Sequence, residues 1–152
     1  MFNIVLFEPE IPPNTGNMMR LCANTGANLH LIHPLGFDID EKSLRRAGLD
    51  YIDQSFIHHY DNYQDYMEKH NSGLLYAIET KGSKIYSNCN FKQGDSFIFG
   101  PETRGLPKNI LDKFEPGKIL RIPMLENSRS LNLSNASAII LYEAYRQQNF
   151  NF

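Results

Sequence analysis

Short apolar runs alternate with amphipathic stretches along this chain. Each run is only a few residues long and is bounded by polar residues, glycine or proline, which is typical of strands that are buried on both faces. The predicted strands are residues 2–6, 29–32, 56–58, 74–78, 96–99 and 119–122. Because helical segments separate many of them, we expect an α/β fold with a mostly parallel sheet and helices on both faces.

Helical periodicity and turn residues place the helices between these strands. The first helix is expected to begin with Asn14 as its cap and to end at Gly26. The prolines of residues 9–13 are expected to form a tight loop before it, because proline interrupts both helix and central strand. The other predicted helices are residues 41–47, 63–70 and 134–148.

Length and composition indicate one ordinary domain. The 152 residues are 41% apolar and 21% charged, so a single domain over residues 1–152 is expected to enclose one core. The net charge of -2 gives no overall positive field that would attract a nucleic acid, so any RNA site must be local. Lys42, Arg45 and Arg46 form the best candidate patch, although such a cluster is also typical of a solvated helix face.

Cysteine usage and the absence of long apolar runs indicate the cellular compartment in which the protein works. Cys22 and Cys89 lie far apart and form no C-x-x-C pair, and the chain opens on a strand pattern without a signal peptide. No apolar run approaches the roughly 18 residues that a membrane span needs. The sequence therefore predicts a cytoplasmic protein that does not enter a membrane.

Three polar loops at predicted strand ends are candidates for a ligand site, because ligands of α/β proteins bind at the carboxyl ends of strands. The first, residues 13–17, leads to Arg20, which can bind a phosphate near a helix start or can simply be a surface charge. The second, residues 99–107, turns between Gly100 and Gly105, and this either admits a flat ligand or is only a structured turn.

The third loop, residues 128–135, places hydroxyl and amide side chains and Arg129 directly before an apolar helix. Capping by Asn132 and Ser134 explains part of this pattern and leaves Ser130 and Arg129 unexplained. The common dinucleotide, P-loop, hydrolase and zincin motifs are absent, and the five histidines have no ligand spacing. We therefore expect no metal and treat the histidines as structural.

Three segments together resemble the knotted SPOUT class of RNA methyltransferases, and within it the tRNA 2′-O-methyltransferases of the TrmL (YibK) type. The resemblance covers essentially the whole chain, and its segments are NIVLFEPEIPPNTGN (residues 3–17), LRRAGLDY (residues 44–51) and SLNLSN (residues 130–135). It implies a deep trefoil knot in the C-terminal third, which general topology rules would have rejected. It also implies a homodimer, with the apolar stripe around Tyr142 and Tyr145 of the last helix near the subunit boundary.

The resemblance further implies S-adenosyl-L-methionine as methyl donor and tRNA as substrate, with the wobble cytidine or uridine, notably of leucine tRNAs, as the target. No metal and no other protein partner are implied. The cofactor would be bound by Ile78, Gly100, Ile122, Met124, Ser130 and Leu131. The acceptor ribose would be surrounded by Asn14, Arg20, Glu102, Ser130 and Asn132, the catalytic set of the resemblance.

Arg20 is the residue on which the predicted chemistry depends most. Because a guanidinium stays protonated in proteins, we expect Arg20 to orient the substrate phosphate and stabilise developing charge rather than to act as a base. Two other functions stay open at this point: a non-catalytic RNA-binding module with the same fold, and a methyltransferase of small molecules, which the net charge of -2 would suit better.

Overall fold

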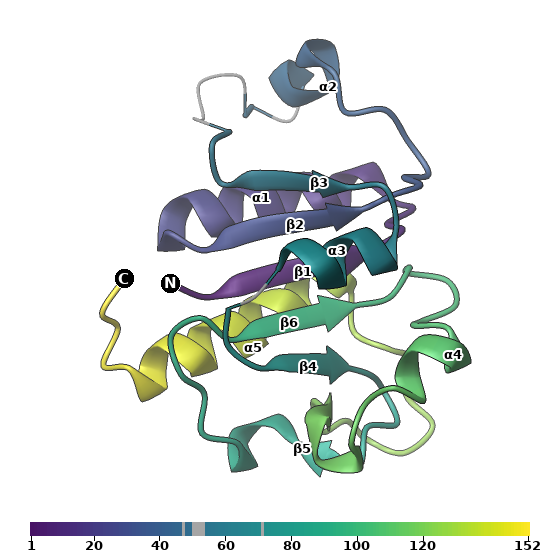
Figure 1. Cartoon of the computed structure of the whole chain (residues 1–152), viewed down its shortest axis with the longest axis vertical. Helices are drawn as coiled ribbons and strands as arrows, with labels where there is room; N and C mark the ends of the chain where they lie inside the picture. The colour runs from purple at the N-terminus through teal and green to yellow at the C-terminus, as the bar shows by residue number, and fades with distance from the viewer. Residues whose placement is uncertain (47, 50–53, 71) are drawn as a thin grey trace.

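The computed structural model describes the chain except for residue 47, residues 50–53 and residue 71. In this described part, parallel strands form one sheet in the order β3-β2-β1-β6-β4-β7-β5 (Figure 1). The strands are β1 Asn3–Phe7, β2 Asn28–Ile32, β3 Ile57–Tyr60, β4 Leu75–Ile78, β5 Lys84–Ile85, β6 Ser96–Phe99 and β7 Ile119–Arg121. The helices are α1 Pro12–Thr25, α2 Glu41–Arg46, α3 Tyr63–Lys69, α4 Lys108–Leu111 and α5 Leu133–Gln147.

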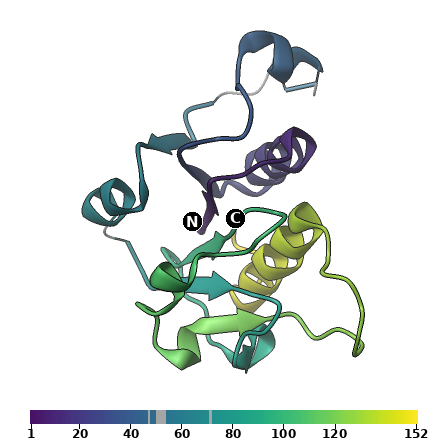
Figure 2. The same cartoon turned by 90° about the vertical axis from the view of Figure 1, so that its right-hand side faces the viewer.

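Helices cover both faces of the sheet, as the sequence predicts. Figure 1 shows α1 and α5 behind the sheet and α3 and α4 in front of it, and Figure 2 shows the same layers from the side. Alternate residues of β1 serve the two layers: Ile4 and Leu6 join the core under α1 and α5, while Val5 and Phe7 join the core under α3 and α4. The α/β prediction with a parallel sheet is thus confirmed.

The start of α1 corrects the sequence prediction. The helix begins at Pro12 and not after Asn14, so Pro12 and Pro13 lie in its first turn. Proline is accepted there because the first N–H groups of a helix have no partner within the helix. Ile11 is the N-cap and provides no side-chain hydrogen bond, so Asn14 is not the cap and its side chain is available elsewhere. The predicted stop is confirmed, because Gly26 has a φ of 70°.

Most other elements agree with the prediction to within one or two residues. Ser96–Phe99 has the predicted bounds, and α5 begins one residue early with Asn132 as its cap. The short elements β5 and α4, and the 3₁₀ turns Tyr86–Asn88 and Pro116–Lys118, were not predicted. They are too short to show a hydrophobic period.

The last helix corrects another expectation. Tyr145 is fully buried, and its ring packs edge-on against Phe2, so it belongs to the core and cannot form a subunit boundary. Tyr142, in contrast, is 45% exposed, and Ile139 is exposed beside it on α5. The part of the stripe that a second subunit could contact is therefore narrower than the sequence suggests.

Several other predictions concern the surface and the cysteines. Lys42 and Arg45 are exposed, whereas the side chain of Arg46 and residues 47, 50 and 51 of the second quoted segment lie outside the described residues. Cys22 and Cys89 are free and buried. Among the described residues, no helix is both long and apolar enough to cross a membrane.

Candidate active site

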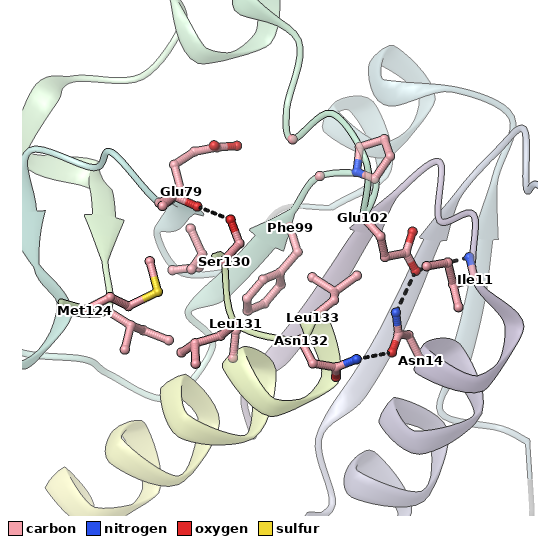
Figure 3. Close-up of a pocket in the computed structure, with 17 residues that line it drawn as sticks. Ile11, Asn14, Glu79, Phe99, Glu102, Met124, Ser130, Leu131, Asn132 and Leu133 are labelled. Atoms are coloured by element: carbon pink, nitrogen blue, oxygen red, sulfur yellow. Dashed lines mark hydrogen bonds between the residues drawn. The ribbon is translucent and has the colours of Figure 1, made fainter. Parts of the chain in front are cut away.

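A cavity of about 320 Å³ opens beyond the carboxyl ends of β4 and β6 (Figure 3). Its walls come from five segments of the chain: the start of α1, the ends of these two strands, the segment after β7, and the loop that leads into α5. The described residues that line it are Ile11, Asn14, Ile78, Glu79, Thr80, Phe99, Gly100, Pro101, Glu102, Gly105, Ile122, Met124, Ser130, Leu131, Asn132, Leu133 and Ala136. This position is where an α/β sheet binds ligands.

Gly100 allows the turn after β6 to fold closely on itself at one wall. A Cβ atom at this position would lie 2.2 Å from the backbone carbon of Gly105 and 2.2 Å from the backbone nitrogen of Leu106. Any side chain would push the turn away from the strand end. Glycine is therefore required here by the approach of backbone to backbone, which leaves one edge of the cavity as bare main chain.

A chain of hydrogen bonds joins three predicted site residues on one side of the cavity (Figure 3). Asn132 donates its Nδ2 proton to Oδ1 of Asn14 at 2.9 Å, and Asn14 donates to Oε1 of Glu102 at 3.2 Å. The Glu102 carboxylate also accepts the backbone N–H groups of Glu10 at 2.8 Å and Ile11 at 3.2 Å. The first turn of α1, the start of α5 and the turn after β6 are thus held in one arrangement.

Asn132 forms hydrogen bonds with residues of both α1 and α5. Its Oδ1 accepts the backbone N–H of Ser134 at 3.0 Å and of Asn135 at 3.3 Å, which caps α5. Because its Oδ1 is occupied in this way, its amide nitrogen is directed toward Asn14, which is only 5% exposed. The orientation of this amide is thus fixed by both of its ends.

The opposite side of the cavity carries a carboxylate and a pair of hydroxyls. Oε1 of Glu79 accepts the backbone N–H of Leu106 at 2.8 Å. Burial raises the pKa of Glu79 above its ordinary value, and the Leu106 N–H only partly opposes that effect. Thr80 and Ser130 share a hydrogen bond of 3.2 Å between their hydroxyl oxygens, which links the end of β4 to the loop before α5.

The family model described as the SpoU rRNA Methylase family matches residues 1–142 of this chain. The chain belongs to the SpoU rRNA methylase family. A tRNA (cytidine(34)-2′-O)-methyltransferase from Saccharophagus degradans is 55% identical to this SpoU methylase over 150 residues, which are 99% of this chain and 97% of the relative. The family to which the sequence resemblance pointed is thereby confirmed.

Two solved structures extend the comparison. One, whose subject is the 2-OH methylation of C/U34 on tRNA, is 41% identical, has a TM-score of 0.90, and is matched over 98% of this chain and 97% of its own. The other, an AdoMet-bound rRNA methyltransferase from Sinorhizobium meliloti, is 27% identical with a TM-score of 0.78. It is matched over 95% of this chain and 56% of its own, so this SpoU methylase corresponds to one part of that longer protein.

The cavity of this SpoU methylase gathers almost all of the predicted site residues. Every predicted cofactor residue lines it, together with Asn14, Glu102, Ser130 and Asn132. Arg20 is the exception: it is exposed and lines a separate cavity of about 630 Å³ with residues that include Phe37 and Leu44. Six residues at 100° each place Arg20 roughly 120° around α1 from Asn14, which is why the two side chains line different cavities.

Sequence reasoning missed several lining residues of this methylase. Glu79 and Thr80 follow directly after a predicted strand, and Phe99 ends another, yet their side chains were given no role. The position of Glu79 at the carboxyl end of a predicted parallel strand was the signal that could have identified it. Leu133 and Ala136 show no such signal, because they look like ordinary residues of an apolar helix face.

His30 on β2 lies against His58 on β3 and His70 after α3, and none of the five histidines lines the cavity. His30 is 4% exposed and contacts the hydroxyl of Tyr60 through Nδ1 at 2.9 Å, and burial is the main reason that its pKa is lowered to about 3. The neighbouring His70 and His58 lower it further. Among the residues that the structure describes, no group of three or more histidine, cysteine or acidic side chains could hold a metal ion.

Proposed function

We propose that this SpoU methylase transfers a methyl group from S-adenosyl-L-methionine to the ribose 2′-hydroxyl of the wobble nucleotide of tRNA, cytidine or uridine, in the cytoplasm. The observation that carries the proposal is the cavity itself. It brings every residue expected to hold the cofactor to one place, beside the hydrogen-bonded Asn14, Glu102 and Asn132. The 55% identical relative from Saccharophagus degradans supports the choice of substrate.

The residues of the cavity suit this cofactor. Ile78, Phe99, Ile122, Met124 and Leu131 supply apolar walls for an adenine ring, and the bare backbone at Gly100 can approach a flat ligand closely. When bound, S-adenosyl-L-methionine supplies an electrophilic methyl group on a positively charged sulfur. The polar side chains gather on both sides of the apolar walls, where they can hold the remaining groups of the cofactor and the acceptor ribose.

The protein's own contribution to the reaction is mainly alignment and charge stabilisation. We assign Asn14, Asn132 and Ser130 to positioning of the acceptor ribose, and Glu102 to holding Asn14 in place through the 3.2 Å hydrogen bond. The 2′-hydroxyl must lose its proton as it attacks. Because guanidinium groups stay protonated in proteins, we assign Arg20 to binding the substrate phosphate. The proton of the 2′-hydroxyl then passes to phosphate or to water.

We also propose that the protein works as a homodimer. The exposed apolar side chains of Ile139 and Tyr142 on α5 support this, because contiguous exposed apolar surface marks protein–protein contact sites. The separation of Arg20 from the cofactor cavity is a second argument, since a second copy could bring the two together. Light scattering should give about 35 kDa, twice the 17.5 kDa of one chain; a mass of one chain would refute the dimer.

The decisive experiment is transfer of a labelled methyl group from S-adenosyl-L-methionine to unmodified bulk tRNA, with Arg20→Ala and Arg20→Lys beside the wild type. Loss of one transition-state contact should lower the rate about 100- to 1000-fold in Arg20→Ala, while Arg20→Lys keeps a trace of activity. Cofactor affinity should not change, because Arg20 does not line that cavity. A fully active Arg20→Ala protein would refute its role.

The same experiment separates the alternatives. RNA binding without cofactor uptake or label would indicate a non-catalytic RNA-binding module. Label in a small molecule, with turnover that is insensitive to salt, would indicate a different substrate class, because tRNA binding must weaken steeply as salt rises. Label at the wobble ribose, located by nuclease mapping, is the result that we expect.

A further inference from the structure

The charged side chains that line the cofactor cavity are all negative. Its described lining residues include two carboxylates, Glu79 and Glu102, and no lysine, arginine or histidine. Glu102 is satisfied by three N–H groups that belong to the protein. Glu79 accepts only the Leu106 N–H in the described structure, and none of the ion pairs among the described residues involves it. A net negative charge is therefore left facing the cavity.

The turn after β6 is shaped around the Glu79 carboxylate. Gly105, which lies next to this carboxylate, has a φ of +66°, a backbone conformation that residues with a side chain rarely adopt. A Cβ atom there would also lie 3.2 Å and 3.4 Å from the two carboxylate oxygens of Glu79. The space that a side chain would fill is thus reserved for the carboxylate, which is half-buried at the rim of the cavity (Figure 3).

Holding a carboxylate in this place is costly for the protein on its own. Burial opposes its ionisation, as the raised pKa of Glu79 shows, and a neutral side chain would avoid that cost. A desolvated carboxylate with a single hydrogen bond is stabilised when a cation binds next to it. The cavity is therefore better matched to a positively charged ligand than to a neutral one.

We infer that Glu79 is a specificity-determining residue that makes the cavity prefer the cationic methyl donor over its neutral product. This inference rests on the proposed function. In the transfer, the ribose oxygen forms a bond to the methyl carbon, the carbon–sulfur bond breaks with its electron pair going to sulfur, and the hydroxyl proton passes to phosphate or to water. S-Adenosylmethionine thus loses its sulfonium charge and becomes S-adenosylhomocysteine, and the attraction to Glu79 weakens at the moment when product must leave.

The test is calorimetric binding of S-adenosylmethionine and S-adenosylhomocysteine to the full chain at about pH 8, far above the ordinary pKa of a glutamate. Glu79→Gln keeps an oxygen acceptor for the Leu106 N–H and removes the charge. We expect it to weaken S-adenosylmethionine about three- to thirtyfold and to change S-adenosylhomocysteine less than about twofold. Glu68→Gln, which removes an exposed carboxylate on α3, is the matched control and should change neither.

A third ligand separates the effect of the positive charge from that of the reactive methyl group. An analogue with an amine in place of the methylsulfonium keeps the positive charge but cannot transfer a methyl group, and it should follow S-adenosylmethionine in both proteins. Equal loss of all three ligands in Glu79→Gln would overturn the inference, because it would place Glu79 against groups that they share. No loss of any would overturn it too. If wild type bound none of them, the proposed function itself would fail.

If Glu79→Gln does not fold, the wild type still provides a test. Protonation removes the same charge, so lowering the pH should reduce the preference for S-adenosylmethionine over S-adenosylhomocysteine. The reduction should begin at a higher pH than for an exposed glutamate. A preference that is constant down to about pH 4 would contradict the inference.

Discussion

Glu102 is the residue at which stability and the proposed site can be tested together. Its carboxylate accepts one side-chain and two backbone N–H groups, and one of the donors, Asn14, is 5% exposed. In Glu102→Ala the backbone donors of residues 10 and 11 can turn to water, because this loop is partly exposed. The buried amide of Asn14 has no such replacement.

The expected loss follows from these contacts. A buried polar group left without its partner costs about 1–3 kcal/mol, and loss of a negative charge near a helix N-terminus costs about 0.3–1 kcal/mol. We therefore expect Glu102→Ala to lower the free energy of unfolding by about 2–3 kcal/mol, and Glu102→Gln, which keeps one acceptor oxygen, by about 1 kcal/mol. In a chain of this size 2–3 kcal/mol corresponds to a fall in melting temperature of about 5–10 °C.

Urea unfolding followed by circular dichroism measures this directly. Glu126→Ala, which removes an exposed glutamate, is the control and should stay within about 0.5 kcal/mol of wild type. Methyl transfer, measured well below the melting temperature, should fall about 10- to 100-fold in Glu102→Ala because Asn14 and Asn132 lose their fixed arrangement. A Glu102→Ala protein as stable as the control would refute the role given to this hydrogen-bond chain.

Two further predictions concern the turn after β6 and His30. Gly100→Ala should lower the unfolding free energy by about 2–4 kcal/mol and abolish cofactor binding. Gly117→Ala is the control and should do neither, because a Cβ atom at Gly117 meets nothing within 4 Å. Thermal unfolding compares the stability of the two variants, and calorimetry compares their cofactor binding. His30 has its pKa lowered to about 3, so as pH falls below about 6.5 the unfolded chain binds a proton that folded His30 does not. Between about pH 6.5 and pH 3 the unfolding free energy should therefore fall by up to about 1.4 kcal/mol per pH unit because of this residue. A pH series of urea titrations in which His30→Gln keeps the full slope would contradict the assignment.

Much of the fold could be predicted from the sequence because buried parallel strands are short apolar runs. Residues 96–99 illustrate this, since all four are buried and the run ends at a glycine. The start of α1 could not be predicted in the same way. Pro12 and Pro13 look like helix breakers, and only the position of the first turn shows that they occupy places where no N–H is needed.

Spacing and periodicity predicted less of the candidate site than of the fold. Its residues came from family resemblance, because spacing alone left Asn14 as a cap and Ser130 without a role. Periodicity could not show that Asn14 lies next to Glu102, since 88 residues separate them in the chain and only the pairing of β1 with β6 brings their loops together. It also could not show that Arg20 faces another cavity, or that Glu79 faces this one.

The position of β1 has a consequence for how this protein is made. On one edge β1 pairs with β2, which follows within about 30 residues, but its other edge pairs with β6, which ends at Phe99. At about 5–20 residues per second, the ribosome needs roughly 2–8 s to extend the chain from Tyr60, where β3 ends, to that point. During those seconds the backbone N–H and C=O groups along the second edge of β1 have no partner strand, which is the condition under which nascent chains aggregate. We expect expression of this protein to depend on chaperones that shield the emerging N-terminal half.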